Sequence, residues 1–351
     1  MIKVDYIIVG LGLAGMAFSE QLEARNKSFV VFHNNEKGAS RVAGGLYNPV
    51  ILKRYSLPWQ GVEQFDLAIP YFKELCEKLG IDAVESMPVK KIFSSAEDQN
   101  NWFEASDKPG LDRFIRPNVT RNDNDAINAP FNLGEVKETG KVDIKQLLNS
   151  YSDYLKSKSA LREEEFDYEK IQFQTNCIQY QDIEARFIVF AEGYGVSKNP
   201  FFKALPLVGN KGEYITIKSP KLGLKSALKS SFFIIPLGDD LYKVGATFNW
   251  KDKDTQPSVS AQSEIVEKLK KVINCDFEIV DQEAGIRPTT GDRRPLLGVH
   301  PKYDRLVILN GLGTRGIMMS PFLAKILYEH LEEGKDLSAD VNINRFTKKL
   351  L

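Results

Sequence analysis

A glycine-rich turn near the N-terminus constrains the fold of this chain most. Residues 6–9 are β-branched or aromatic, which favours a short strand covered on both faces. They lead into Gly10, Gly12 and Gly15, in the pattern Gly-x-Gly-x-x-Gly, and then into a helical pattern from residue 16. Strand, turn and helix together predict a dinucleotide site at the positive end of the helix, with a plain glycine-rich turn as the alternative. The predicted contact residues are Gly10, Gly12, Leu13, Ala14 and Gly15.

The end of the second predicted strand, residues 29–32, departs from the usual dinucleotide pattern. An acidic residue normally binds the ribose hydroxyls there, about 20 residues past the glycines. This chain has His33 and Asn34 instead, followed by Glu36. We expect His33 or Asn34 to hydrogen-bond the ribose, or Glu36 to reach back to it. An exposed polar loop is the alternative.

Composition places the chain among ordinary soluble globular proteins. Of its 351 residues, 42% are apolar and 27% are charged. Lys+Arg 47 balance Asp+Glu 47, so the net charge of zero favours neither a nucleic acid nor an anionic membrane as partner. The first strand begins almost at Met1, and no apolar run approaches the ~20 residues that cross a bilayer. We therefore expect a cytoplasmic protein without a signal peptide or membrane span.

A second glycine-rich loop, residues 38–49, contains three glycines and two alanines. So many small residues predict that the backbone lies against something large and flat. With the N-terminal motif, the loop resembles the D-amino-acid oxidase and glycine oxidase family of flavoproteins. The family's second loop is similar to Gly-Ala-Ser-x-x-x-Gly-Gly-Leu and touches the ribityl and flavin parts of FAD. The resemblance implies FAD contacts from Ser40, Arg41, Ala43, Gly44, Gly45 and Leu46.

Two later stretches extend the resemblance. Residues 285–298 are similar to the family's Gly-x-Arg-Pro-x-Thr-x-Asp-x-x-Pro-x-x-Gly, and residues 310–317 form a glycine turn that opens the last helix. This second helix start offers donors that would stabilise a reduced flavin, and in the family the matching turn contacts the flavin ring. A strand ending at residue 190 resembles the family's return under the diphosphate, with Glu192 in place of a small residue. The implied contacts are Ala191, Glu192, Gly193, Arg287, Gly311, Gly313, Thr314, Arg315, Gly316 and Ile317.

The predicted fold is α/β, with a Rossmann-like FAD-binding domain and a second α+β domain on a mixed or antiparallel sheet. We expect residues 1–50, 140–205 and 285–351 in the FAD-binding domain, and residues 51–139 and 206–284 in the substrate-binding domain. Apolar periodicity predicts helices at 62–80, 97–104, 144–155 and 260–272, and strands within 163–190 and 206–250. The strands within 163–190 include one at residues 164–169.

Arg287 is the first candidate for a substrate contact. A guanidinium can donate two parallel hydrogen bonds to a carboxylate. In the resembling family the arginine of Gly-x-Arg-Pro binds the substrate carboxylate in this way. The alternative is an ion pair with Asp292 or another buried acid. Tyr214 and Tyr242 are placed in the strands above the flavin, although both also suit ordinary strand positions.

Arg315 has two predicted roles. Its setting, Leu-Gly-Thr-Arg-Gly-Ile, resembles a turn in the oxidase half of the bifunctional tRNA wobble-uridine modification enzyme more than the matching turn of glycine oxidase. Arg315 therefore either binds substrate or neutralises the flavin.

Together the motifs imply an FAD-dependent oxidoreductase that oxidises the C–N bond of a small amino acid or secondary amine carrying a carboxylate. Hydride would pass to flavin N5 and then to O2 or another acceptor. No cysteine or histidine lies in the matching turns, so we expect non-covalent FAD. Two alternatives stay open. One is a tRNA wobble-uridine carboxymethylaminomethyl oxidase, and the other is a non-catalytic flavin-binding or scaffold protein.

Overall fold

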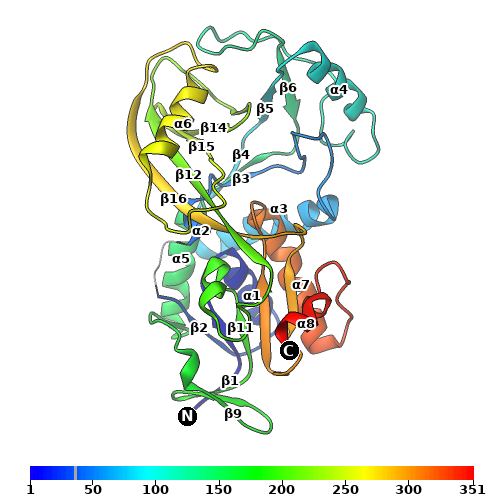
Figure 1. Cartoon of the computed structure of the whole chain (residues 1–351), viewed down its shortest axis with the longest axis vertical. Coiled ribbons are helices and arrows are strands. Elements are labelled where there is room, and N and C mark those ends of the chain that lie inside the picture. The colour runs from blue at the N-terminus through cyan, green and yellow to red at the C-terminus, as the bar shows by residue number, and fades with distance from the viewer. Residues whose placement is uncertain (35–37) are drawn as a thin grey trace.

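The structure is a computed structural model that describes residues 1–34 and 38–351, so Glu36 lies outside the described residues. The described strands form two large sheets and one small one. In Figure 1 the first sheet lies in the lower half, the second lies in the upper half, and helix α3 (Gly61–Leu79) runs between them.

The first sheet is largely parallel. Its order is β17-β18-β11-β1-β2-β8, with only β17 antiparallel to its neighbour, and β10 and β9 extend it beside β11. The strands are β1 (Ile2–Val9), β2 (Phe29–Phe32), β8 (Leu161–Arg162), β9 (Ile171–Phe173), β10 (Ile178–Tyr180), β11 (Ile183–Phe190), β17 (Leu296–Val299) and β18 (Leu306–Asn310). The carboxyl ends of β1, β2, β11 and β18 therefore meet at one edge, where open α/β sheets bind ligands.

Both faces of this sheet are covered, as residues 6–9 predict. Tyr6 and Ile8 pack into the cluster formed with the helices, whereas Ile7 and Val9 pack into a second cluster on the opposite face.

The other helices are α1 (Leu13–Glu23), α2 (Ala39–Val42), α4 (Ala96–Ser106), α5 (Ile144–Ser157), α6 (Val259–Leu269), α7 (Gly316–Glu333) and α8 (Thr347–Leu350), with 3-10 turns η1 (Tyr168–Lys170), η2 (Gly193–Lys198) and η3 (Ile343–Phe346).

The second sheet is mostly antiparallel, in the order β16-β12-β15-β14-β13-β5-β6. Its strands are β5 (Val89–Ile92), β6 (Leu133–Val136), β12 (Leu207–Lys218), β13 (Ala227–Lys229), β14 (Phe233–Gly238), β15 (Leu241–Gly245) and β16 (Glu278–Thr290). One face packs on α6, and the other faces the first sheet. The small sheet contains β3 (Leu46–Tyr47), β4 (Val84–Ser86) and β7 (Gly140–Val142).

Most local predictions are confirmed. The helix predicted at 62–80 is α3, which contains Pro70 and ends at Gly80 in the left-handed conformation. The predicted cap of α5 is also present, because the Asp143 carboxylate accepts the Gln146 backbone N–H at 2.9 Å. Helices at 97–104 and 260–272 correspond to α4 and α6 within a few residues.

The strand predicted at residues 164–169 is wrong. The segment is irregular and ends in η1, without pairing to any described strand. Phe166 explains the difference, because its ring stacks on Tyr180 with centroids 4.2 Å apart and meets Phe32 edge-on. The alternation of charged residues with the aromatic Phe166 resembles a strand pattern, but Phe166 instead packs as a single side chain against the face of the first sheet.

The proposed division into two discontinuous domains stays a prediction. Strand β16 belongs to the second sheet and runs across the proposed boundary at residue 285. Within the described ranges, no helix combines the length and apolar character needed to cross a bilayer.

Candidate active site and cofactor cavity

A cavity of about 1030 Å³ lies between the two large sheets. Its floor is the edge where the parallel strands end, so residues directly after β1, β2 and β11 line it. Its roof is the face of the second sheet opposite α6. All three glycine-rich stretches singled out in the sequence contribute to its wall.

The first turn has the geometry that the glycine pattern predicts. Gly10 adopts a φ of +104°, which a residue with a side chain rarely adopts. A Cβ on Gly15 would lie 1.9 Å from the Gly10 carbonyl oxygen, so the closeness of α1 to the strand requires glycine. Gly15 itself packs behind the turn and does not line the cavity. This corrects its place among the cofactor contacts.

Two helix starts meet at the cavity. Helix α1 begins at Leu13 and α7 at Gly316, and a Cβ on Gly316 would lie 3.1 Å from Leu13 Cδ1. Neither N-cap residue accepts a hydrogen bond with its own side chain, although the Ser40 hydroxyl accepts the Leu13 N–H at 3.3 Å. Two positive helix ends side by side are suited to anionic groups.

The structure brings most of the predicted cofactor contacts together. In addition to Gly15, one predicted contact lies outside the cavity wall: Gly311, which packs against Pro295 and Leu296. The predicted residues that do line the cavity are Gly10, Gly12, Leu13, Ala14, His33, Asn34, Ser40, Arg41, Ala43, Gly44, Gly45, Leu46, Ala191, Glu192, Gly193, Arg287, Gly313, Thr314, Arg315, Gly316 and Ile317.

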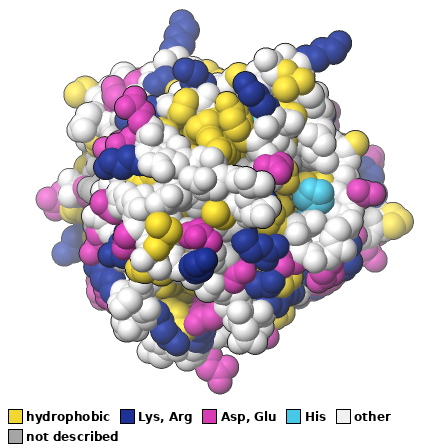
Figure 2. All heavy atoms as spheres, turned by 90° about the horizontal axis from the view of Figure 1, so that it is seen from below, with side chains coloured by type: hydrophobic (Ala, Val, Ile, Leu, Met, Phe, Trp, Pro, Cys, Tyr) yellow, Lys and Arg dark blue, Asp and Glu magenta, His cyan; other side chains and the backbone are white. Residues whose placement is uncertain are grey.

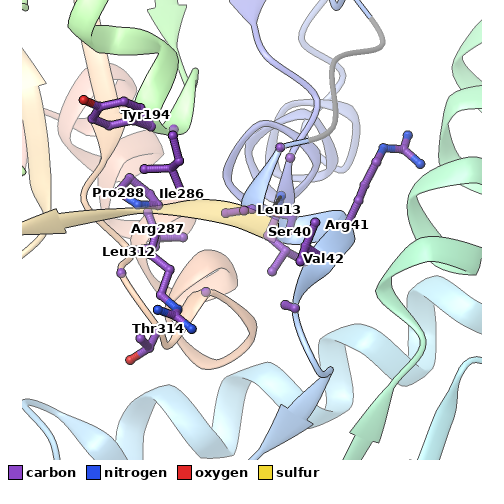
Figure 3. Close-up of a pocket in the computed structure, with 18 of the residues that line it drawn as sticks. Leu13, Ser40, Arg41, Val42, Tyr194, Ile286, Arg287, Pro288, Leu312 and Thr314 are labelled. Atoms are coloured by element: carbon purple, nitrogen blue, oxygen red, sulfur yellow. Dashed lines mark hydrogen bonds between the residues drawn. The ribbon is translucent and has the colours of Figure 1, made fainter. Parts of the chain in front are cut away.

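Arg287 enters the cavity from β16 and carries no acid partner among the described residues. Its guanidinium donates to Asn210 Oδ1 at 2.8 Å and to the Thr247 carbonyl at 3.2 Å. It lies over Gly212, where a Cβ would come within 2.0 Å of Arg287 Nη2. Figure 3 shows the side chain extending from the strand toward Thr314.

The ion pair considered between Arg287 and Asp292 does not form. Asp292 accepts instead from Arg345 Nε at 3.1 Å and from the Arg294 backbone N–H at 3.0 Å. Arg287 therefore keeps guanidinium hydrogens for a carboxylate ligand, and the ring of Phe248 lies 4.7 Å from its central carbon.

Arg315 is a second cation at the cavity. It is the N-cap residue of α7, and its Nη1 donates to the Asn48 carbonyl at 3.4 Å. It forms no ion pair with any residue that the structure describes. Burial lowers the pKa of its guanidinium to about 10, which still leaves it charged at neutral pH. A half-buried cation without an anion favours a negatively charged ligand beside it.

Tyr214 and Tyr242 lie on opposite faces of the second sheet. Tyr214 lines the cavity, with the Lys243 ammonium 5.1 Å from its ring centre. Tyr242 is 3% exposed and packs in the cluster beneath α6, which corrects its predicted place above the flavin. The pairing register explains this, because Tyr242 is opposite Ile217, which faces α6.

Glu192 is held by its neighbours at the first-sheet end of the cavity. Its carboxylate accepts the Tyr168 hydroxyl at 2.5 Å and the Asn199 amide at 2.8 Å. Burial raises the pKa of this carboxyl group to about 7, against the lowering effect of those two hydrogen bonds. Glu192 thus lies just after the end of β11, next to Gly193 in the cavity wall.

Sequence reasoning missed side chains that form the roof. Lys229, Phe233 and Ile235 from the strands and Phe248 from the loop after β15 line the cavity but lie in no recognisable motif. The available signal was the alternation along β14, where Phe233 and Ile235 share the face opposite to Ile234.

These features define an α/β oxidoreductase-type protein with a dinucleotide cavity roofed by a second sheet. The pattern of the family described as FAD dependent oxidoreductase, abbreviated DAO, matches residues 5–330. The chain belongs to this family of FAD-dependent oxidoreductases.

Two curated relatives and one solved structure illustrate the similarity. Glycine oxidase of Bacillus subtilis is 22% identical over 360 residues, which cover 96% of this chain and 95% of that protein. Glycine oxidase of Bacillus licheniformis is 30% identical over 151 residues, but this match spans only 41% of this chain and 40% of that protein. The crystal structure of glycine oxidase from Geobacillus kaustophilus has a TM-score of 0.81 at 22% identity, over 99% of this chain and 98% of that chain.

The residues present fit FAD. The start of α1 suits a diphosphate, the start of α7 offers a second set of backbone donors, and small residues keep the loop at residues 38–49 close to the roof. A Cβ on Gly44 would lie only 2.6 Å from Ile235 Cδ1. Arg315 places a positive charge in the cavity wall, and a positive charge stabilises a reduced flavin.

Proposed function

We propose that the protein oxidises the C–N bond of a small amino acid or secondary amine that carries a carboxylate. The observation that carries the proposal is Arg287, a cation at the cavity with no acid partner among the described residues. Its two hydrogen bonds are to neutral oxygen atoms, which orient the guanidinium without neutralising it. A substrate carboxylate would complete this arrangement.

The chemistry that FAD supplies when bound is acceptance of a hydride from the substrate carbon beside nitrogen. The residues of the chain would bind the cofactor and orient the substrate against it. The start of α1 would hold the diphosphate, while the start of α7 and the loop at residues 43–46 would lie along the flavin. Arg287 would hold the substrate carboxylate so that its α-carbon faces the cofactor, while Tyr214 closes the roof. Arg315 would stabilise negative charge on the reduced cofactor.

The first experiment is the absorbance spectrum of freshly purified protein under anaerobic conditions, before and after adding small amino acids and N-methylated amino acids. Bleaching of the flavin bands by one compound is the expected result and identifies the substrate class. Admission of air then tests whether O2 reoxidises the flavin. Flavin bands that no amine bleaches would contradict the proposed activity.

We also propose that FAD is held without a covalent bond. Neither a cysteine nor a histidine occurs in the loop at 38–49 or in the turn at 310–317. Acid precipitation should therefore release all yellow colour into the supernatant. Colour that stays with the precipitated protein would contradict this.

The tRNA-modifying alternative rests on the turn around Arg315. In Figure 2, cations and acids are intermingled on the face shown, and the whole chain has no net charge. A tRNA gel shift that weakens steeply with salt would favour this alternative, because phosphate contacts release counterions. No shift in low salt would leave the small-amine proposal in place.

A further inference from the structure

A lysine on the roof suggests a second anion-binding position in the same cavity. Tyr214, Gly245, Phe233 and Lys229 lie opposite one another across four neighbouring strands. Residues opposite one another share a face, and all four line the cavity. At about 4.8 Å per strand, the backbone of Lys229 lies roughly 14 Å from that of Tyr214. The roof thus extends three strands beyond Tyr214, away from β16, which carries Arg287.

Lys229 has no acid partner among the described residues. Its ammonium group donates to the Ser230 carbonyl at 2.7 Å and lies 5.0 Å from the centre of the Phe233 ring. The adjacent lysine in the parallel register, Lys91, behaves differently. It pairs with Asp98 at 2.6 Å and does not line the cavity. Two neighbouring lysines therefore differ in that only the one facing the cavity lacks a counter-ion.

The surroundings of Lys229 are positively charged. Lys53, from the loop after β3, also lines the cavity without an ion pair in the described part of the chain. Burial and the nearby charges of Lys91 and Lys53 lower the pKa of Lys229 to about 8. Like charges in a cavity destabilise one another, and an anionic ligand would remove this repulsion.

The acids of the cavity lie elsewhere. Glu164 and Glu165 precede Phe166 at the first-sheet end, and Glu192 is bound there by Tyr168. Asp254 lies on the other side of the roof and pairs with Lys211 at 2.7 Å. Among the described residues that line the cavity, those of the roof around Lys229 therefore combine cations with Ser231 and apolar side chains, and they include no carboxylate. Asp98, which pairs with Lys91, lies outside the cavity wall.

We propose that Lys229, assisted by Lys53, binds a second carboxylate of the substrate, so that amino- or iminodicarboxylic acids are preferred over monocarboxylic amines. This inference rests on the proposed function, because it places the oxidised C–N bond between the carboxylate held by Arg287 and the one held by Lys229. It names Lys229 as a residue that determines specificity, not as an acid or base.

The test compares substrates that differ in one carboxylate. Iminodiacetate and N-ethylglycine form one pair. Glutamate and norvaline form another, and both enantiomers of each are tested. The wild-type enzyme should prefer the dicarboxylic member of the accepted pair. Lys229→Met should lower its kcat/KM for that member at least about tenfold and change kcat/KM for the monocarboxylic member less than about threefold. Lys229→Arg should restore most of the preference.

Lys225→Met is the matched control. Lys225 is exposed, lies four positions earlier in the same segment and does not line the cavity. Its replacement removes the same charge and should leave both substrates unaffected. Equal losses for both substrates in Lys229→Met, or a wild-type preference for the monocarboxylic member, would overturn the proposal.

Binding of succinate separates this inference from the proposed oxidation, because succinate has no amine to oxidise. Calorimetric titration of the holoenzyme should show that succinate binds at least about tenfold more tightly than butyrate, and that Lys229→Met removes the difference. If succinate binds in this way but no amine bleaches the flavin, the anion site stands and the oxidation proposal fails. If monocarboxylic amines bleach the flavin and Lys229→Met changes neither binding nor turnover, the oxidation proposal stands and this inference fails.

Discussion

At the residue scale, Arg287 and Arg315 both reach the cavity without an ion-pair partner in the described part of the chain, but they differ in their neighbours. Arg287 lies under the roof against Asn210 and Gly212, where a substrate would enter above the cofactor. Arg315 lies at the start of α7, on the cofactor side. The positions therefore suggest different tasks, with Arg287 binding substrate and Arg315 balancing cofactor charge.

Replacing Arg287 with alanine should raise the substrate KM at least about tenfold, the order of one charge-assisted hydrogen-bond pair. The FAD content should remain near that of the wild type, because the cofactor contacts come mainly from other residues. Steady-state kinetics with the best amine measures the effect. Arg121→Ala, at an exposed site outside the cavity, serves as the control. An unchanged KM in Arg287→Ala would remove Arg287 from the substrate site.

Glu192 predicts a pH dependence of stability. Its native pKa of about 7 lies above the ordinary value of 4.5, so the native state holds the proton more tightly than the unfolded state. Its stabilising effect is therefore fully present below about pH 4.5 and is lost as the pH rises through 7. The Tm of the wild type should fall by several degrees more than that of Glu192→Gln across this window.

Thermal melts of the two proteins at both ends of the window measure the difference. Glu164→Gln removes an exposed acid from the same end of the cavity and should behave like the wild type. Parallel Tm curves for the wild type and Glu192→Gln would contradict the prediction.

At the element scale, the contact between β1 and α1 depends on the absence of a side chain at Gly15. A Cβ there would lie 1.9 Å from the Gly10 carbonyl oxygen. Relief of this clash would require the backbone of either Gly15 or Gly10 to move, which would disturb the turn. The same turn presents the start of α1 to the cavity. Stability and cofactor binding are thus linked through one position.

Gly15→Ala should destabilise the protein by about 3 kcal/mol, at the upper end for overpacked sites, and should lower the flavin content of the purified protein. Thermal unfolding and the ratio of flavin to protein absorbance measure the two effects. Gly291→Ala is the matched control, because Gly291 is exposed, lies outside the cavity wall and has no atom within 4 Å of an added Cβ. Comparable stability and flavin content in Gly15→Ala and Gly291→Ala would contradict the packing argument.

At the scale of the whole molecule, the cavity is shared by the two large sheets. The first sheet provides the turn and the helix starts, and the second sheet provides the roof. A ligand that spans both therefore stabilises both, whereas a ligand that reaches only the first sheet stabilises the arrangement less.

FAD should therefore raise the Tm of cofactor-depleted protein more than ADP does at the same free ligand concentration, because contacts with both sheets lower the Kd of FAD below that of ADP. A ligand at about 1,000 times its Kd adds about 4 kcal/mol to the free energy of unfolding. ADP matches only the diphosphate and adenosine end of FAD, so it should leave the roof without a partner. Differential scanning fluorimetry across ligand concentrations measures both shifts. Equal shifts for ADP and FAD would contradict a flavin site beneath the roof.

Local sequence determined much of this protein. The strand, turn and helix at residues 6–23, the cap of α5 at Asp143 and the end of α3 at Gly80 follow from apolar periodicity and from residues with special backbone or capping properties. Each of these features depends on neighbours within a few positions. The order of the glycine-rich stretches also indicated the family, because each stretch serves a different part of one long cofactor.

The tertiary structure alone decided which side chains meet. Tyr242 faces α6 because strand pairing sets it opposite Ile217. A shift of one residue in this pairing would move the Tyr242 side chain to the other face of the sheet. Asp292 pairs with Arg345, far away in the sequence, which leaves Arg287 available to a ligand. Lys229 reaches the cavity only because four strands line up across the sheet. Long-range pairing determines these contacts, and no local pattern in the sequence records it.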